Sequence, residues 1–579
     1  MKKYKVLKKV RVAISLIFLI VLGLFFLDFA GTFPSEFISG AIFLQFVPSL
    51  LKFFTVFSWV ATGFVAITIL TLLFGRVYCS TICPLGIMQD VVSWLRRRFQ
   101  KKKKKYRYLK AMRWLRYGIL GATVAFLASG SIVVLSIFDP YSTFGRIVSD
   151  LFRPVLTEGN NLLAGVLNKF DIYALYQVDL HSLHVGVLAV PMAFLIAVVW
   201  MSLAQGRLYC NTICPVGTFL GLLSKVSLYQ IRLNPTTCTK CGICEKKCKA
   251  SCIDTKNMKL DFARCVGCFN CLQACPFSAA EYSINPLYRS LTLNNGSGEN
   301  TNNEGSSEKT SHKSSPEKAQ PQDPAKKPQT GASSANPGHS TSAASENKQG
   351  SQSHHTDTGK RKFLAGMALA FFSATKLSKA QELVSYSATK PVKRDHPVSP
   401  PGAESTDRFN EKCTACHLCV NVCPTQVLQP ALLEYGLRGL MQPRMDYHAG
   451  FCNYDCVECG DVCPTGAILP IKLEDKKRVQ LGKAQFVKEN CIVETEGTDC
   501  GSCSEHCPTK AVQMVDYKNN LRIPEVDDEI CVGCGACEYA CPTHPYKAIY
   551  VEGNPVHLQA KKPQQEKVKR EEPKEDFPF

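Results

Sequence analysis

Twenty-four of the 29 cysteines fall into six groups of four, with spacings typical of iron–sulfur proteins. The first two groups follow the order Cys-x2-Cys-x2-Cys-x3-Cys and consist of Cys238, Cys241, Cys244, Cys248 and of Cys265, Cys268, Cys271, Cys275. Two-residue spacers let one loop place three thiolates on three corners of a four-iron cube, while the fourth thiolate reaches the neighbouring cluster. Zinc sites usually use two Cys-x2-Cys pairs, or cysteine with histidine. The pattern therefore predicts a two-cluster [4Fe–4S] ferredoxin rather than a zinc site.

One detail of the first group leaves its fourth ligand open. Lys249 stands where a proline usually follows the fourth cysteine, and an extra Cys252 comes shortly afterwards. The fourth ligand is either Cys248 or Cys252, and the regular spacing favours Cys248.

Four more groups lie beyond residue 400 and predict four more clusters. They consist of Cys413, Cys416, Cys419, Cys423; of Cys452, Cys456, Cys459, Cys463; of Cys491, Cys500, Cys503, Cys507; and of Cys531, Cys534, Cys537, Cys541. The first and last groups have the regular spacing, whereas the middle two have irregular spacers. Cys491 is the least secure ligand, because eight residues separate it from Cys500, and a bystander thiol is the alternative there. The sequence thus predicts six [4Fe–4S] clusters, with iron as the metal at all 24 cysteines.

Four further cysteines belong to an internal repeat. The segment Gly75–Gly86 recurs almost unchanged as Gly206–Gly217, and each copy carries a Cys-x3-Cys-Pro motif. The motif cysteines are Cys79, Cys83, Cys210 and Cys214. Each copy follows the second helix of an expected two-helix unit, so an axis along the membrane normal would relate the two units. We expect one of three roles for these thiols: a shared metal site near this axis, redox-active thiols, or a docking surface for another subunit.

The chain of 579 residues is too long for one core and too uneven in composition for one soluble globule. Its mean hydropathy is −0.03, yet the first 210 residues are strongly apolar. A bilayer span takes about 20 residues, and four stretches are long enough: 12–27, 53–75, 117–138 and 183–205. We therefore expect a multidomain protein with a four-helix transmembrane bundle over residues 1–232, followed by α+β ferredoxin-like domains. Tight cysteine groups in a long chain also exclude a secreted disulfide-rich mini-protein.

The net charge of +20 is largely a topology signal. Residues 1–11 and 76–116 carry six and thirteen Lys or Arg, against one and three in 32–52 and 139–182. Positively charged loops face the cytoplasm, so we expect a multi-pass protein of the cell (inner) membrane with a cytoplasmic N-terminus. A lysine run beside a span contacts anionic lipid, and we expect no nucleic-acid partner.

The remaining boundaries follow from composition and motifs. We expect ferredoxin domains at 233–284 and 400–555, a disordered linker at 285–359 and a charged tail at 556–579. The segment 360–382 begins with Lys360-Arg361-Lys362-Phe363-Leu364 and has an apolar run of twelve residues, which is short for a span. It resembles a twin-arginine export signal, which would place the second ferredoxin domain in the periplasm. A short buried helix or membrane anchor, with a cytoplasmic tail, is the alternative.

The chain resembles two known families in succession. Residues 1–282 resemble the NapH-type membrane ferredoxins, which have four helices, two Cys-x3-Cys-Pro motifs and a two-cluster ferredoxin. Residues 360–550 resemble the NapG/MauM-type ferredoxins, which have a twin-arginine-like leader and four cysteine groups with these irregular spacers. The resemblance implies crossed ligation of four clusters, by Cys413, Cys416, Cys419 and Cys541; by Cys531, Cys534, Cys537 and Cys423; by Cys452, Cys456, Cys459 and Cys507; and by Cys491, Cys500, Cys503 and Cys463.

The same resemblance implies the electron-transfer component of an oxidoreductase, a quinol dehydrogenase of anaerobic respiration. Such a protein oxidises quinol from the membrane pool and passes the electrons to a redox partner, either a periplasmic reductase such as nitrate reductase or a cytochrome. Related proteins with the same repeat-plus-ferredoxin half act instead in metal-centre assembly or regulation, and would reduce a copper or cluster target. The sequence identifies no catalytic residue. The acidic candidates for the proton of quinol are Asp28 and Asp139, although a plain interfacial residue is the favoured explanation for each.

Overall fold

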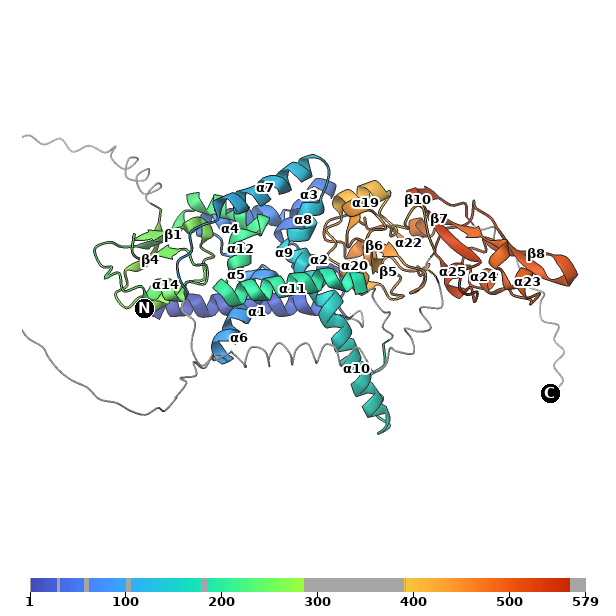
Figure 1. Cartoon of the computed structure of the whole chain (residues 1–579), viewed down its shortest axis with the longest axis horizontal. Helices are drawn as coiled ribbons and strands as arrows, with labels where there is room; N and C mark the ends of the chain where they lie inside the picture. The colour runs from blue at the N-terminus through green and yellow to red at the C-terminus, as the bar shows by residue number, and fades with distance from the viewer. Residues whose placement is uncertain are drawn as a thin grey trace, which may run out of the picture. The chain divides into compact units, whose positions relative to one another are not determined.

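The computed structural model describes residues 2–28, 32–56, 62–99, 106–178, 185–285, 390 and 392–562. The expected linker at 285–359, apart from Asn285, and the expected leader at 360–382 lie outside these residues. The described parts form a helical region and two ferredoxin regions rich in short helices and two-stranded sheets (Figure 1).

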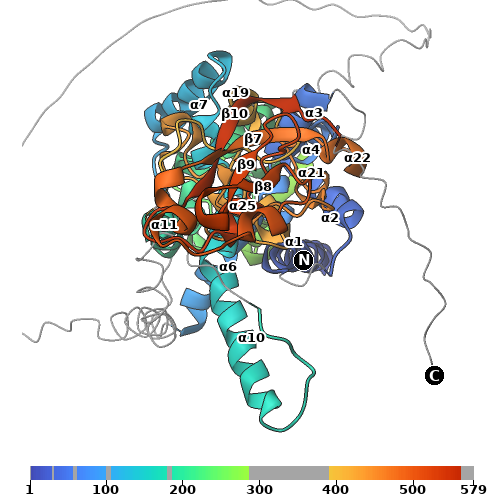
Figure 2. The ribbon, with the colours of Figure 1, turned by 90° about the vertical axis from the view of Figure 1, so that its right-hand side faces the viewer.

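The helical region occupies the first 226 residues. Its elements are α1 (Lys2–Leu27), α2 (Ser35–Ile42), α3 (Phe46–Val56), α4 (Gly63–Phe74), α5 (Tyr78–Thr81), α6 (Pro84–Phe99), α7 (Arg113–Ala128), α8 (Val133–Phe138), α9 (Pro140–Arg146), the π-helix η2 (Ile147–Phe152), α10 (Arg153–Asn168), α11 (Val185–Gln205), α12 (Leu208–Thr212), α13 (Pro215–Leu223) and η3 (Ser224–Val226). Helix α10 projects away from the other described helices (Figures 1 and 2).

Two described helices are long and apolar enough to cross a membrane, over Tyr4–Leu27 in α1 and Gly186–Gln205 in α11. Helices α2 and α3 would add a third span only as a pair bent by 107°. The stretch expected at 53–75 contains α4, an apolar helix of 12 residues. The structure therefore supports a helical region with two candidate spans, and it does not confirm a four-helix bundle.

The stretch expected to span at 117–138 is interrupted at Gly130. Gly130 has a φ of +76°, the left-handed conformation that glycine adopts readily. The amide of Gly130 donates to the Leu127 carbonyl, and the amide of Ser131 donates to the Phe126 carbonyl. These two hydrogen bonds form a Schellman motif, which ends α7 and turns the chain before α8 begins.

The first ferredoxin region closes on an antiparallel pair of strands, β1 (Tyr229–Leu233) and β4 (Ala280–Ile284). Between them lie a small hairpin of β2 (Ile253–Asp254) and β3 (Lys259–Leu260), and the helices α14 (Ile243–Lys247) and α15 (Asn270–Ala274). A left-handed residue precedes each helix, Gly242 before α14 and Phe269 before α15. The two halves thus share one loop-and-helix design, and each cysteine-rich loop turns sharply into its helix.

The second ferredoxin region contains three antiparallel strand pairs. These are β5 (Leu428–Pro430) with β6 (Pro443–Met445), β7 (Val479–Phe486) with β10 (Ile549–Gln559), and β8 (Val512–Asp516) with β9 (Arg522–Val526). Its helices are α19 (Thr406–Lys412), α20 (Leu418–Val422), α21 (Glu458–Asp461), α22 (Leu473–Lys476), α23 (Ile492–Thr495), α24 (Ser502–Glu505) and α25 (Ala536–Ala540). Strand β10 runs to Gln559, past the expected domain end at residue 555. The region has two separate hydrophobic cores, one around Phe409 and Tyr447 and one around Val512 and Ile549.

Candidate iron–sulfur centres

The first ferredoxin region brings its eight predicted ligands together as two sets of four. Cys238, Cys241 and Cys244, from the loop before α14 and its first turn, line one pocket with Cys275 from the end of α15. In the second set, Cys248 lies near Cys268 and Cys271, and Cys265 lies near both of them as well. Each set therefore takes three thiols from one loop and the fourth from the other group, as the two-cluster spacing predicts.

The extra Cys252 lies at the edge of the second set. Its Sγ is 3.6 Å from Cys248 Sγ, and it also contacts Cys265. Cys248 is a neighbour of both Cys268 and Cys271, whereas the contacts of Cys252 are with Cys248 and Cys265. This arrangement favours Cys248 as the fourth ligand and leaves Cys252 as a buried neighbour of the cluster.

The second ferredoxin region forms four sets, and the first two exchange their fourth cysteines. Cys413, Cys416 and Cys419 all have Cys463 as a close electrostatic neighbour. Conversely, a pocket is lined by Cys452, Cys456 and Cys459 together with Cys423. The fourth thiol of each group thus completes the set of the group next to it in the sequence.

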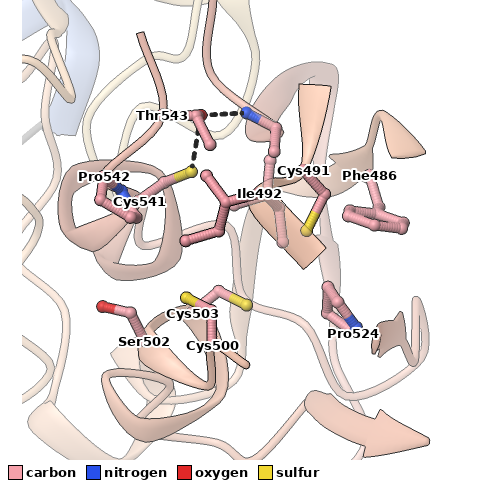
Figure 3. Close-up of a pocket in the computed structure, with 12 residues that line it drawn as sticks. Phe486, Cys491, Ile492, Cys500, Ser502, Cys503, Pro524, Cys541, Pro542 and Thr543 are labelled. Atoms are coloured by element: carbon pink, nitrogen blue, oxygen red, sulfur yellow. Dashed lines mark hydrogen bonds between the residues drawn. The ribbon is translucent and has the colours of Figure 1, made fainter. Parts of the chain in front are cut away.

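The last two groups exchange their fourth cysteines in the same way. Cys491, Cys500 and Cys503 line a pocket with Cys541, and Figure 3 shows these four thiols around one space. Cys531 and Cys537 have Cys507 as a close neighbour, and so does Cys534. Cys491, which the spacing made the least secure ligand, lies in the same pocket as Cys500 and Cys503.

The crossed ligation that the family resemblance implied is therefore wrong in its partners. Cys463 completes the set of Cys413 rather than that of Cys491, and Cys541 completes the set of Cys491 rather than that of Cys413. Likewise, Cys423 belongs with the Cys452 set and Cys507 with the Cys531 set. The physical reason is the two hydrophobic cores, because each core packs two consecutive groups around itself.

The four sets of this region also follow one another in space. Cys419 is a neighbour of Cys459, which links the first set to the second. The amide of Cys452 donates to the carbonyl of Cys534 at 2.9 Å, which links the second set to that of Cys531. The Cys531 set and the Cys491 set are linked because each contains the fourth cysteine of the other group, Cys507 and Cys541 respectively. The order is a line of four sets that begins at Cys413 and ends at Cys491.

The chemistry of these sets fits iron–sulfur clusters. Burial raises the pKa of the Cys416 and Cys503 thiols to about 12, so a bare thiolate is disfavoured at either position. Bound iron would supply the positive charge that stabilises the thiolates and would release their protons. The hydroxyl of Tyr141 is buried without a hydrogen-bond partner among the described residues, close to Cys416 and Cys463. A cluster sulfur there would accept this orphaned hydrogen bond.

The structure also brings the four repeat cysteines together. Cys214 lies near Cys79, Cys83 and Cys210, and all four thiols are buried. Among the described residues, no three His, Cys, Asp or Glu side chains are grouped as ligands of a single metal ion.

The two ferredoxin regions contact opposite ends of both candidate spans. At the start of α1, Lys8 Nζ donates to Gln273 Oε1 in the first region at 2.7 Å. At its end, the Phe26 carbonyl accepts a hydrogen bond from Asn421 of the second region at 3.1 Å. Helix α11 runs the other way: Val187 near its start packs with Ala415 of the second region, and Gln205 at its end accepts from Ser251 of the first.

A buried polar contact, which the sequence did not reveal, joins the second ferredoxin region to the helical region. His417, between the predicted ligands Cys416 and Cys419, lies 2.8 Å from Asp150 through Nδ1 and 2.8 Å from the Met441 carbonyl through Nε2. Arg153 donates to the side chain and the carbonyl of Asn421, at 3.0 Å each. The only sequence signal was a histidine and an asparagine close to cluster ligands.

The two acidic candidates for quinol chemistry have structural partners. Asp139 caps α9 and accepts hydrogen bonds from the amide and hydroxyl of Ser142 at 2.7 Å. Burial raises the pKa of Asp139 to about 6, and it lies near Cys416 rather than at an exposed surface. Asp28 accepts from the Thr32 hydroxyl and the Phe33 amide, a local turn at the end of α1.

Comparison with known families agrees with these sites. Residues 55–103 and 187–234, which contain the two repeat motifs, match a family described as a 4Fe-4S binding domain. Residues 412–468 and 498–544 match two families described as 4Fe-4S dicluster domains, and 265–279 match a further 4Fe-4S binding domain. The match at 412–468 covers one pair of consecutive groups, and the match at 498–544 covers the other pair except Cys491; each pair shares a core in the structure.

Among curated proteins, an uncharacterised protein of Methanocaldococcus jannaschii is 26% identical over 49% of the chain and 97% of its own length. The ferredoxin-type protein NapH of Escherichia coli is 26% identical over 37% of the chain and 64% of its length. The methylamine utilization ferredoxin-type protein MauM of Methylophilus methylotrophus is 32% identical over 25% of the chain and 66% of its length. The chain is a NapH/MauM-type ferredoxin.

Membership in the NapH/MauM-type ferredoxins supports an iron–sulfur electron-transfer role with several [4Fe–4S] clusters. Together with the two apolar helices, the NapH-like relative indicates a membrane protein with membrane-associated redox partners. The chain spans about two thirds of the NapH and MauM relatives. No solved structure matches the chain.

Proposed function

We propose that this NapH/MauM-type ferredoxin oxidises quinol at the membrane and delivers the electrons to a reductase on the outer side, such as a periplasmic nitrate reductase. Six [4Fe–4S] clusters, when bound to the 24 cysteines, would supply one-electron carriers for this transfer. The protein itself would position the clusters one after another and connect the two sides of the membrane. The observation that carries the proposal is the contact of the two ferredoxin regions with opposite ends of α1 and α11.

The contacts and the charge distribution together give a topology. Helix α1 contacts α15 near its start and α20 near its end, so a membrane around α1 would separate the two ferredoxin regions. The basic N-terminal tail favours a cytoplasmic start of α1. The first ferredoxin region would then be cytoplasmic and the second periplasmic, which agrees with the export signal expected at 360–382.

The line of four thiol sets suggests a direction within the second ferredoxin region. The Cys413 set lies against the helical region, since Cys416 belongs to the core that contains Phe26 and Tyr141. The Cys491 set lies at the other end, and Cys500 is partly exposed. An outer redox partner would therefore dock near Cys500 and take electrons from the end of the line.

Protease added to spheroplasts tests the topology. We expect cleavage within 392–562 in intact spheroplasts, while the loop at 106–112 is cut only after lysis. The two ferredoxin regions carry separate epitope tags so that their fragments can be told apart. Protection of residues 392–562 in intact spheroplasts would refute the outer location and favour a wholly cytoplasmic protein.

Anaerobic mixing of the full, detergent-solubilised protein with a reduced quinol analogue tests the reaction. We expect the visible cluster absorbance to bleach, because reduction of [4Fe–4S] clusters lowers it. Dithionite serves as the control, since it reduces clusters without a quinol site and reports how much absorbance can be lost. If dithionite bleaches the protein and no quinol analogue does, quinol oxidation is excluded and a role in metal-centre assembly becomes the better reading.

A further inference from the structure

The two repeat motifs build one compact, buried site. Cys79, Cys83, Cys210 and Cys214 are each 3% exposed. Cys83 lies near Cys79 and Cys210, and Cys214 lies near all three other thiols. Four thiols from two helix–loop–helix segments, far apart in sequence, therefore lie close together in the helical region.

Two arginines hold the motifs together in a reciprocal frame. Arg76 of the first copy donates to the Cys210 carbonyl at 3.1 Å, and Arg207 of the second copy donates to the Cys79 carbonyl. Gly86 and Gly217 leave room for this crossing: a Cβ at Gly86 would lie 2.6 Å from Arg207, and one at Gly217 would lie 2.7 Å from Arg76. The frame explains why both copies keep arginine at their second position and glycine at their last.

The site carries buried positive charge that the protein does not balance. Arg76 is fully buried and forms no ion pair among the described residues. Its guanidinium donates to the Asn211 side chain and to the carbonyls of Ala263 and Cys210, and its NH2 lies 3.8 Å from Cys79 Sγ. Its Nε has no partner among the described atoms, and neither has the NH2 of Arg207. A buried cation without a counter-charge is strongly destabilising, so the site requires an anion.

The thiols are arranged to supply that anion once a metal is bound. Four thiolates around an oxidised iron–sulfur cluster leave a net negative charge. N–H donors already point at the sulfurs: Gln89 Nε2 lies 3.2 Å from Cys210 Sγ, and the Gly217 amide lies 3.2 Å from Cys214 Sγ. Such hydrogen bonds stabilise cluster thiolates, whereas neutral thiols are weak acceptors.

We propose that Cys79, Cys83, Cys210 and Cys214 ligate one further iron–sulfur cluster, shared by the two copies of the repeat. The family match covers both copies but names no ligands, and the structure assigns them to a single centre. This centre would be distinct from the six predicted in the ferredoxin regions, and Arg76, which has no ion pair among the described residues, would balance its charge.

The position of the site gives it a role in the electron transfer proposed above. On one side, Arg207 Nε donates to Asp90 at 2.8 Å, and Asp90 pairs with Lys249, which lies beside the ligand Cys268. On the other side, Tyr209 neighbours Cys210, Cys214 and Asp139, and Asp139 neighbours the ligand Cys416. The four thiols thus lie between the two ferredoxin regions, and a redox centre there would connect them.

Metal analysis of the full protein, purified anaerobically, tests this inference. Cys83→Ser/Cys214→Ser is expected to lose about two to four irons per chain, with matching sulfide, because four thiolates can hold either a two-iron or a four-iron cluster. Thr157→Val is the matched control, since Thr157 is also buried in the helical region but lies on α10, outside the motifs, and the iron content of this variant should not change. Unchanged iron in the double variant, or zinc in place of iron at the site, overturns the proposal.

A second measurement covers the case in which the double variant does not fold. Mössbauer spectra of the wild-type protein, enriched in 57Fe, should require a component beyond the six ferredoxin clusters. Gln89→Leu removes one hydrogen bond to Cys210 and should lower the midpoint potential of that component alone, with the iron content kept. A spectrum that six clusters explain fully overturns the proposal. These results do not depend on quinol, so the metal site and the quinol reaction can fail separately.

Discussion

Replacing Cys463 with serine is expected to destroy the cluster held with Cys413, Cys416 and Cys419, and to leave the cluster of the Cys491 set intact. Cys463 is a close neighbour of all three thiols in the first set, whereas the Cys491 pocket is completed by Cys541. Removal of a cluster ligand in a buried site leaves the cluster incomplete, so the variant should lose up to about four irons per chain. Iron and acid-labile sulfide analysis of the purified full protein measures the loss.

Double variants identify which cluster is lost. Cys416→Ser/Cys463→Ser should lose no more iron than either single variant, because both residues ligate the same cluster. Cys463→Ser/Cys503→Ser should lose about the sum of the two single losses, because the residues ligate different clusters. Spin counts of the reduced proteins by electron paramagnetic resonance should follow the same rule. The opposite pattern, with additive loss for Cys416 and shared loss for Cys503, would restore the pairing that the resemblance implied.

The spacing of cysteines predicts three ligands of each cluster well and the fourth poorly. Three thiols on one loop, such as Cys413, Cys416 and Cys419, are fixed by two-residue spacers and a short following helix. The fourth cysteine comes from a different loop, and the packing of the hydrophobic core determines which loop that is. In the first ferredoxin region only one partner group exists, so the sequence could assign Cys275 and could narrow the other fourth ligand to Cys248 or Cys252. With four groups the spacing allows several partners, and the two cores around Phe409 and Val512 select among them.

The irregular spacing of the Cys491 group does not prevent its three cysteines from lying together. Eight residues separate Cys491 from Cys500, yet both line one pocket. Helix α23 and a turn at Gly497, whose φ is +63°, fold the extra residues back so that the two thiols face the same space. The spacer length alone could not reveal this turn, although a glycine within the spacer was a usable signal.

Hydropathy predicted the apolar helices but not their continuity. A window of apolar residues cannot distinguish one long helix from two short helices joined by a turn, because both arrangements remove the same apolar side chains from water. The left-handed Gly130 and the 12-residue helix α4 are such cases. The repeat motif, in contrast, was read correctly as two copies of one unit, because its arginine and glycine positions are set by contacts between the copies.

The departure at Lys249 also has an explanation in tertiary structure. Lys249 Nζ lies 3.2 Å from Asp90, which also accepts from Arg207 at 2.8 Å and from Arg11 at 3.5 Å. Burial alone would raise the pKa of Asp90, but Arg207 and Lys249 hold it well below its usual range. One carboxylate on α6 therefore balances cations from α1, the second repeat copy and the first ferredoxin region. A proline at position 249 would lack this charge.

Asp90→Asn is expected to destabilise the whole assembly of helical region and first ferredoxin region. The substitution keeps the shape of the side chain but leaves Arg207, Lys249 and Arg11 as buried cations without a counter-charge. Removal of one partner from a buried ion pair costs about 3–5 kcal/mol, because the remaining charge stays desolvated. We expect the midpoint of thermal unfolding in detergent, followed by cluster absorbance and tryptophan fluorescence, to fall by on the order of 10 °C.

The matched control for Asp90 is Asp528→Asn, which breaks an ion pair with Lys483 in which the side chains are 51% and 36% exposed. Exposed pairs contribute about 0–1 kcal/mol, so this variant should unfold close to the wild-type midpoint. Lys249→Met in the Asp90→Asn background should recover part of the lost stability, because it removes one of the uncompensated cations while keeping the length of the side chain. An unchanged midpoint in Asp90→Asn would mean that water or another anion already balances Arg207. The argument from buried charge would then no longer support the link from Arg207 through Asp90 to the first ferredoxin region.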